Sequence, residues 1–174
     1  MRTPGPGASH AAQPWNEIIP GLWMGGYHYL DASGERRPAV VTDEFDVVIS
    51  LHRRDGHGPP GDVEHHRADL PDGPLTPGQM ETVSRLSATA VEALRRGRRV
   101  LVRCGTGDNL SGLVVAQSLT MMGYPADEAI SVVRGRRSGR ALNNRLFVDY
   151  LTTGLDVARL LTGLDSLPQD GDLG

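Results

Sequence analysis

The sequence predicts an α/β fold in which a central, mostly parallel sheet is flanked by helices. Short runs rich in Val, Ile and Leu alternate along the chain with longer segments whose apolar residues recur every three or four positions, as on one face of a helix. Strands that alternate with helices form parallel sheets with helical crossovers. The 174 residues suit one domain, since single domains most often hold roughly 100 to 200 residues. We place it at residues 15–165, between a flexible Pro/Gly-rich arm (1–14) and a loose polar tail (166–174).

The first third of the chain predicts a hairpin and a buried strand. Residues 15–26, WNEIIPGLWMGG, hold two apolar runs on either side of a Pro-Gly pair, which is typical of two short strands joined by a turn. Residues 27–30 are expected to begin a short helical turn, and residues 34–38 to form a loop. The run FDVVISL at 45–51 is almost wholly apolar, so we expect a strand buried on both faces.

Two further strands and the helices follow. The strands are expected at 63–68, after an exposed loop, and at 98–103. The first helix is expected to open with Thr76 as N-cap and Pro77 at its first position, and to end near Gly97. The other helical segments are expected at 109–123, at 125–137 and at 138–164, the last as one long helix or as two broken near Gly154.

Composition and charge narrow the classes of function. The net charge is −3 and 39% of the residues are hydrophobic, so no overall basic character indicates nucleic acid or an anionic membrane as partner. The apolar stretches are far shorter than the roughly 20 residues of a membrane span, and the start of the chain lacks the pattern of an export signal. A single cysteine cannot form an internal disulfide, which favours a reducing compartment. We therefore expect a soluble cytoplasmic protein and, because all 18 basic residues are arginine, an origin in a GC-rich bacterium.

The single cysteine, Cys104, stands where the strand at 98–103 meets the Gly-rich segment CGTGDNLSG. A loop that opens a helix directs backbone N–H groups and the positive end of the helix dipole to one point. Thiolates are stabilised at such a point, and anions bind there. Cys104 is therefore a candidate nucleophile in an anion-binding loop, and the alternative is a small buried hydrophobic residue.

The loop resembles the signature loop of the protein tyrosine and dual-specificity phosphatases, Cys-x-x-Gly-x-x-Arg followed by Ser or Thr. Cys104, Gly107 and Ser111 are in register with that pattern, and Leu110 stands at the position of its arginine. The resemblance covers roughly residues 15–152. Within it, EIIPGLWMGG resembles the family's opening hairpin, FDVVISL its buried strand, and RALNNRLFVDYL the helix that usually carries an Asn and a Phe. The resemblance implies a dual-specificity phosphatase-like α/β fold.

The resemblance also implies roles for individual residues. Cys104 would attack phosphorus and form a phosphocysteine. Asp72, in a PDG loop 32 residues before the cysteine, would protonate the leaving oxygen, and the family spacing favours it over the competing Asp69. Ser111 would hydrogen-bond the sulfur and help it leave. The phosphate oxygens would be held by the backbone amides of the loop, which are those of Gly105, Thr106, Gly107, Asp108, Asn109 and Leu110.

Two loop residues depart from the family pattern. The family's arginine both binds the phosphate dianion and stabilises its transition state, and Leu110 can do neither. Asp108 adds a negative charge inside the loop. A substitute cation could come from the segment VRGRRSGR, and the alternative is that this segment is a solvated basic loop. The candidate cations are Arg136, Arg137 and Arg140.

Arg103 occupies the position where the family commonly has His. Adjacent residues of a strand face opposite sides, so we expect Arg103 to lie behind Cys104 and to support the loop rather than touch a substrate.

Three other interpretations have little support. VLVRCGTGD resembles the first motif of the S-adenosylmethionine-dependent methyltransferases, but only about seventy residues follow it, too few for the remaining crossovers. A dinucleotide-binding pattern fails because Leu110 fills the position of its third glycine. The histidines at 52, 57, 65 and 66 do not have the spacing of a known metal site. We therefore expect neither a metal nor another cofactor.

Two functions remain open. The first is a catalytically impaired phosphatase-like protein (a pseudophosphatase) that binds a partner or a phosphorylated group. The second is an active phosphomonoester hydrolase that forms a phosphocysteine at Cys104 and uses a substitute arginine. Its substrate would be a phosphoprotein (Tyr, Ser or Thr) or a small phosphorylated metabolite.

Overall fold

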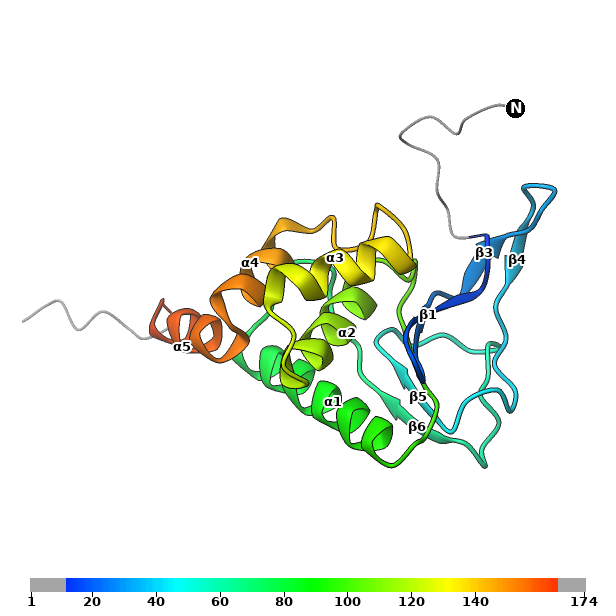
Figure 1. The fold of residues 1–174 in the computed structure, drawn as a ribbon, viewed down its shortest axis with the longest axis horizontal. Coiled ribbons are helices and arrows are strands. Elements are labelled where there is room, and N and C mark those ends of the chain that lie inside the picture. Colours follow the sequence, from blue (N-terminus) through cyan, green and yellow to red (C-terminus); the bar gives the residue numbers. More distant parts are fainter. Residues whose placement is uncertain (1–11, 166–174) are drawn as a thin grey trace, which may run out of the picture.

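The computed structural model describes residues 12–165 (Figure 1). The predicted tail and residues 1–11 of the predicted arm lie outside this range. One five-stranded sheet forms the centre of the fold, and its β1–β2 pair is antiparallel while the other three neighbouring pairs are parallel. In spatial order its strands are β1 (Trp15–Ile19), β2 (Leu22–Gly25), β7 (Val100–Arg103), β5 (Val47–Ser50) and β6 (Glu64–Arg67). The predicted α/β class with a mostly parallel sheet is confirmed.

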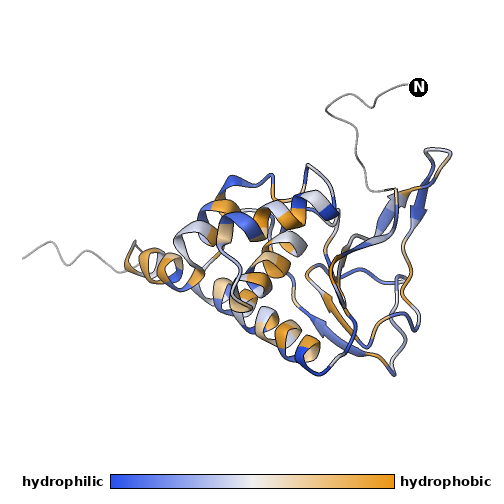
Figure 2. Ribbon diagram, viewed as in Figure 1, coloured by the Kyte–Doolittle hydropathy of each residue, from blue (hydrophilic) through white to orange (hydrophobic). Residues whose placement is uncertain are grey.

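The helices lie on one side of this sheet (Figure 1); the first three contact its strands, and the last two pack mainly against other helices. They are α1 (Pro77–Arg95), α2 (Leu110–Met121), α3 (Ala126–Arg136), α4 (Arg145–Thr153) and α5 (Leu155–Asp165). The helix sides that face the sheet are largely apolar (Figure 2), and α2 is the most deeply buried of the five helices, with nine buried residues. Among the described residues, no helix combines the length and the apolar character needed to cross a membrane.

Alternate residues of the central strands belong to two separate cores. Val47, Ile49 and Val102 belong to the main core beneath the helices. Val48 and Leu101 point the other way and pack with residues such as Phe45 in a smaller core. Because strand side chains alternate between faces, Arg103 lies on the side of Leu101, away from the helices.

A second, two-stranded sheet replaces the predicted helical turn and loop after β2. β3 (His28–Leu30) pairs antiparallel with β4 (Arg36–Pro38). The turn between them is organised by Asp31, whose Oδ1 accepts hydrogen bonds from Ser33 N at 2.9 Å and from Glu35 N at 3.0 Å. The prediction was wrong because an Asp that accepts from the backbone two residues on forms a turn, and this turn brings the flanking residues into register.

The helix ends lie close to the predicted positions, except at the start of the last predicted segment. Residues 138–144, predicted as helix, form turns, and α4 begins only at Arg145 because the Asn144 side chain caps it by accepting from Leu146 N. Thr76 caps α1 in a reciprocal capping box with Gln79, and Pro77 is its first residue. The segment at 138–164 contains two helices, because Gly154, with a φ of +101°, interrupts it between α4 and α5.

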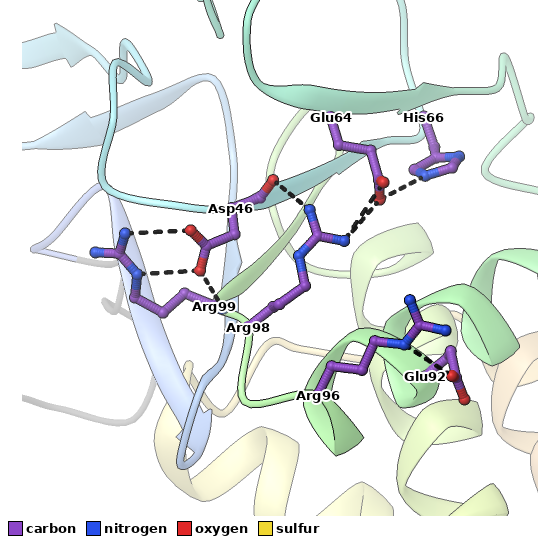
Figure 3. A network of polar contacts seen from close by, with 7 residues as sticks. All are labelled: Asp46, Glu64, His66, Glu92, Arg96, Arg98 and Arg99. Carbon is purple, nitrogen blue, oxygen red and sulfur yellow. Dashed lines mark hydrogen bonds and ion pairs between the residues drawn. The ribbon is translucent and has the colours of Figure 1, made fainter.

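Arginines join the amino ends of the central strands (Figure 3). Arg99 binds the Asp46 carboxylate through its backbone N–H at 2.8 Å and through Nε at 3.3 Å, and these bonds lower the pKa of Asp46. Arg98 reaches Glu64 Oε1 on β6 at 3.4 Å. These contacts are partly solvated, so each contributes little stability. The polar groups at the opposite, carboxyl ends of the strands form the candidate site.

Candidate functional site

The candidate site is the loop between the carboxyl end of β7 and the start of α2. Cys104, the first residue after β7, is 3% exposed, and its Sγ lies 3.2 Å from the Oγ of Ser111. Ser111 is the second residue of α2, so the helix amino terminus and the thiol face the same point. The neighbouring β2 and the residues after it fix the start of the loop, because Cys104 N donates to Gly25 O and Tyr27 N donates to Gly105 O.

Gly107 sits at the most crowded point of the loop. Its φ is +76°, and a Cβ there would lie 2.6 Å from Gly25 C, Gly26 N and an Arg137 guanidinium nitrogen. Only glycine meets both conditions, the left-handed backbone and the close approach. The loop is therefore pressed against the end of β2 on one side and against Arg137 on another.

Arg137 braces this loop from the end of α3. Its side chain is buried, and its Nε donates to Gly107 O at 3.2 Å. One terminal nitrogen donates to Asn16 Oδ1 at 2.8 Å and to Gln13 O at 3.4 Å, so residues just before β1 also belong to this arrangement. Burial lowers the pKa of Arg137, and the charges of Asp108 and Cys104 oppose this shift. The guanidinium is thus close enough to the loop to act on its charges, while its hydrogen bonds go to backbone and amide oxygens.

Leu110 fills the position where the resemblance places an arginine. It is 5% exposed and lines a hollow of about 310 Å³ together with Cys104, Leu70 and Asp72. An aliphatic side chain offers a phosphate neither a charge nor a hydrogen bond. In this part of the loop, the donors available to an anion are therefore backbone amides.

Asp72 lies beside the loop and is held there by side-chain amides. Its Oδ2 accepts from Asn109 Nδ2 at 3.1 Å and its Oδ1 accepts from Asn144 Nδ2 at 2.8 Å. Asn109 Oδ1 also accepts a hydrogen bond from the backbone N–H of Asn144 at 2.9 Å, and Asn109 Nδ2 donates to Asn143 Oδ1 at 2.9 Å. Asn109 therefore connects the cysteine loop, the Asp72 loop and the start of α4. Sequence reasoning missed this role, and the NN pair before α4 was the available signal.

Asp69, the competing acid candidate, does not face the loop. Its Oδ1 accepts from the backbone N–H of Arg53 at 3.1 Å and lies 3.7 Å from His52 Nδ1. Asp69 therefore helps to shape the loop after β5.

A cavity of about 580 Å³ opens over the cysteine loop. One wall is the β3–β4 hairpin, which contributes His28, Tyr29 and Arg36. Arg137 and the exposed Arg140 also line this cavity, along with Asp72 and Asp108. Arg136 instead borders a separate hollow with Glu17 and Tyr124. Of the three candidate substitute cations, two are thus brought to the cavity. The hairpin wall could not be foreseen, because its strands were not predicted.

Arg103 lies behind Cys104, as its place in the strand predicted. It is 1% exposed, and its Nε donates to Ser50 Oγ at 2.9 Å while its other nitrogens donate to the carbonyl oxygens of His57 and Gly58. Burial lowers its pKa. These bonds fasten the end of β7 to β5 and to the loop that follows β5.

The four histidines considered as metal ligands are engaged separately. His57 Nδ1 lies 3.0 Å from Ala39 O, His65 Nε2 lies 2.8 Å from Ser50 Oγ, and His66 Nε2 lies 3.2 Å from Glu64 Oε2. Within residues 12–165, no three His, Cys, Asp or Glu side chains are grouped so that they could hold a metal ion.

His65 predicts a pH dependence of stability. Burial, followed by the charges of Arg67 and Arg103, lowers its pKa from 6.5 to about 4. The unfolded chain therefore binds a proton below pH 6.5 that the folded chain binds only near pH 4, so stability falls as the pH falls through this window. A shift of this size corresponds to about 3 kcal/mol for a fully buried group. Because His65 is only partly buried, solvent screens its charge, and we expect it to account for a smaller loss of about 1 to 2 kcal/mol. Urea unfolding of wild type and His65→Gln at several pH values measures it, and equal pH profiles would contradict the assignment.

Solved structures of phosphatases share this fold. Human DUSP28 superimposes with a TM-score of 0.67 at 20% identity, over 87% of this chain and 99% of that chain. A mouse putative dual specificity phosphatase complexed with zinc tungstate gives 0.65 at 22% identity, over 95% and 100%. Human tyrosine phosphatase-like serine/threonine/tyrosine-interacting protein gives 0.58 at 20% identity, over 84% and 97%. The fold is that of the dual-specificity phosphatases.

The sequence comparisons add nothing to this likeness, since neither a protein-family model nor a curated protein matches the chain. Identities near one fifth show a shared fold, and a shared fold does not by itself assign an activity. Function has to be argued from the groups that surround Cys104.

Proposed function

We propose that this protein is a phosphatase-like protein of the dual-specificity type that binds a phosphorylated group, on a protein partner or on a small molecule, and turns it over slowly or not at all. The observation that carries the proposal is Leu110, a buried aliphatic side chain at the loop position where this mechanism needs a cation. No metal or other cofactor is part of the proposal.

Binding is supported by the loop backbone. The residues from Gly105 to Ser111 run from the end of β7 into the first turn of α2, where the free N–H groups of a helix start are directed at an anion. Cys104 immediately precedes this segment, and the Ser111 hydroxyl lies within hydrogen-bond distance of its sulfur. A phosphoryl group placed above the sulfur would meet several amide donors.

Slow turnover is supported by the charges around the position where the phosphoryl group would bind. Removing one preorganised donor from a transition state typically costs about 10² to 10³ in rate, and a bidentate guanidinium supplies two donors and a charge. Arg137 lies next to the loop, but its hydrogen bonds to the oxygens of Gly107, Gln13 and Asn16 hold the backbone in place. Asp108, which also lines the cavity, adds negative charge close to the position of a dianion.

The second candidate is an active phosphomonoester hydrolase, and one observation favours it. Arg36 and Arg140 line the same cavity as Asp72 and the loop. A phosphorylated substrate that enters between them would meet guanidinium groups that this chain supplies from outside the loop. In this case Asp72 would protonate the leaving oxygen while Cys104 takes the phosphoryl group.

Two measurements on the same protein separate binding from turnover. Tungstate, a tetrahedral oxyanion, should bind to the wild type in a calorimetric titration, because the amide cradle does not need Leu110. Hydrolysis of an aryl phosphate should be weak, and whatever remains should disappear in Cys104→Ser. Brisk wild-type turnover that Cys104→Ser abolishes would favour the hydrolase, and failure to bind any oxyanion would overturn both candidates.

A further inference from the structure

A second cavity lies on the face of the sheet that the helices leave uncovered. It has a volume of about 150 Å³, and the carboxyl ends of β5, β6 and β7 border it together with the loop after β5. Four arginines line it, and Asp55 is the one carboxylate among its lining residues. These arginines are Arg53, Arg54, Arg67 and Arg103.

Arg103, the buried arginine of this cavity, donates its hydrogen bonds to neutral groups and stacks on a neutral ring. These groups are the Ser50 hydroxyl, the carbonyl oxygens of His57 and Gly58, and the ring of Tyr27, whose centroid lies 4.7 Å from the guanidinium carbon. None of the ion pairs between described residues includes Arg103. A buried charge without a counter-charge is costly, and an anion in the cavity would supply that counter-charge.

The mouth of the cavity is also positively charged. Arg53, Arg54 and Arg67 are exposed, and Arg67 Nε donates to His65 Nδ1 at 3.1 Å. His65 in turn contacts Ser50, the residue that Arg103 also binds. A polar chain thus runs from the surface to the buried guanidinium.

The carboxylates in this region do not balance the charge. Asp55 lines the cavity, and Asp69 accepts from the backbone of Arg53 beside His52. Two carboxylates therefore face four guanidinium groups. An anion that approaches this face is attracted from the surface inward.

We propose that this cavity is an oxyanion site, separate from the Cys104 loop, and that it takes a phosphate-like or sulfate-like group. Guanidinium forks match the geometry of such oxyanions. The cavity volume of about 150 Å³ suits a small tetrahedral ion. The site would take either the free ion or the phosphoryl end of an ester that projects out of the mouth, and the test distinguishes the two.

Binding here would stabilise the strand end that carries the cysteine loop. Arg103 immediately precedes Cys104, and its carbonyl oxygen accepts from Leu51 N at 2.9 Å. A ligand that binds the folded chain and not the unfolded one raises the unfolding temperature. The inference does not depend on whether the Cys104 loop binds or hydrolyses a phosphorylated group.

The test compares matched arginine variants of the full chain by amide NMR during titration with inorganic phosphate. Arg54→Gln/Arg67→Gln removes two charges from the mouth of the cavity, and Arg85→Gln/Arg95→Gln removes two exposed charges from α1. We expect saturable shifts at Ser50 and Gly58 in the wild type and in the α1 variant. In the cavity variant the affinity reported by these amides should fall about tenfold, or about 1.4 kcal/mol.

Phosphate shifts confined to the amides from Gly105 to Ser111 would overturn the proposal, as would equal weakening in the two variants. The variants leave Arg103 in place, so loss of folding does not confuse the result. A parallel titration with phenyl phosphate identifies the source of the anion. Shifts at Ser50 and Gly58 with both ligands indicate a site open to esters, and shifts with phosphate alone indicate a site for the free ion.

Discussion

Leu110→Arg is expected to raise the turnover of an aryl phosphate at least about 10²-fold over the wild type, the lower end of what one preorganised transition-state donor contributes. Leu110 is the first residue of α2 and lines a hollow of about 310 Å³ next to Cys104. The hollow gives a longer side chain room to turn its guanidinium toward the phosphoryl group. The measurement is steady-state hydrolysis by the two purified proteins under identical conditions.

Matched variants show whether the gain comes from charge. Leu110→Gln introduces a polar side chain without a charge and should give no comparable increase. Adding Cys104→Ser to Leu110→Arg should abolish the activity, because the proposed hydrolysis uses the Cys104 sulfur as its nucleophile. Neutralising the neighbouring charge with Asp108→Asn should raise the rate further. A wild type that is already as fast as Leu110→Arg would mean that the cavity supplies its own cation, with Arg36 and Arg140 as the residues to remove next.

The parts of the fold that were predictable from sequence are those fixed by local physical chemistry. Hydrophobic runs marked the strands β5 and β7, the capping residue Thr76 marked the start of α1, and Gly154 marked the break before α5. The β3–β4 hairpin was missed because it has no alternating apolar pattern and its turn depends on hydrogen bonds to one side chain, Asp31. Pattern reasoning detects burial, and this hairpin is largely solvated.

The candidate site divides along the same line. The grouping of Cys104, Gly107 and Ser111 in one loop could be predicted, because these residues lie close together in the sequence and match one loop pattern. The sequence could not show which arginine approaches that loop, because Arg136 and Arg137 are adjacent. Where α3 ends determines that Arg137 is buried against Gly107 and that Arg136 borders another hollow. The bridge from Asn109 to Asp72 and Asn144 joins three segments, and its one sequence signal, the NN pair before α4, does not show which groups that pair would meet.

Gly107→Ala is expected to lower the free energy of unfolding by about 3 kcal/mol and to abolish tungstate binding at the cysteine loop. A left-handed backbone costs a residue with a Cβ about 1 to 2 kcal/mol, and overpacking adds about 1 to 3 kcal/mol. Both penalties apply here, because φ is +76° and the new methyl group would lie 2.6 Å from backbone atoms of Gly25 and Gly26. To relieve this steric overlap, the loop must move away from β2. Its amide N–H groups then no longer point at the bound anion. Urea unfolding measures the first effect, and a tungstate titration followed by the NMR shifts of the amides from Gly105 to Ser111 measures the second.

Gly105→Ala is the matched control within the same loop. A Cβ at Gly105 would have no neighbouring atom within 4 Å, and its φ lies outside the left-handed region. We expect its stability to remain within about 0.5 kcal/mol of wild type, as for most surface substitutions, and tungstate binding to persist. Should Gly107→Ala bind tungstate as tightly as Gly105→Ala does, the amides of this loop are not what holds the anion. The contrast between the two alanines therefore tests the cradle by its geometry, independently of whether the protein turns over any substrate.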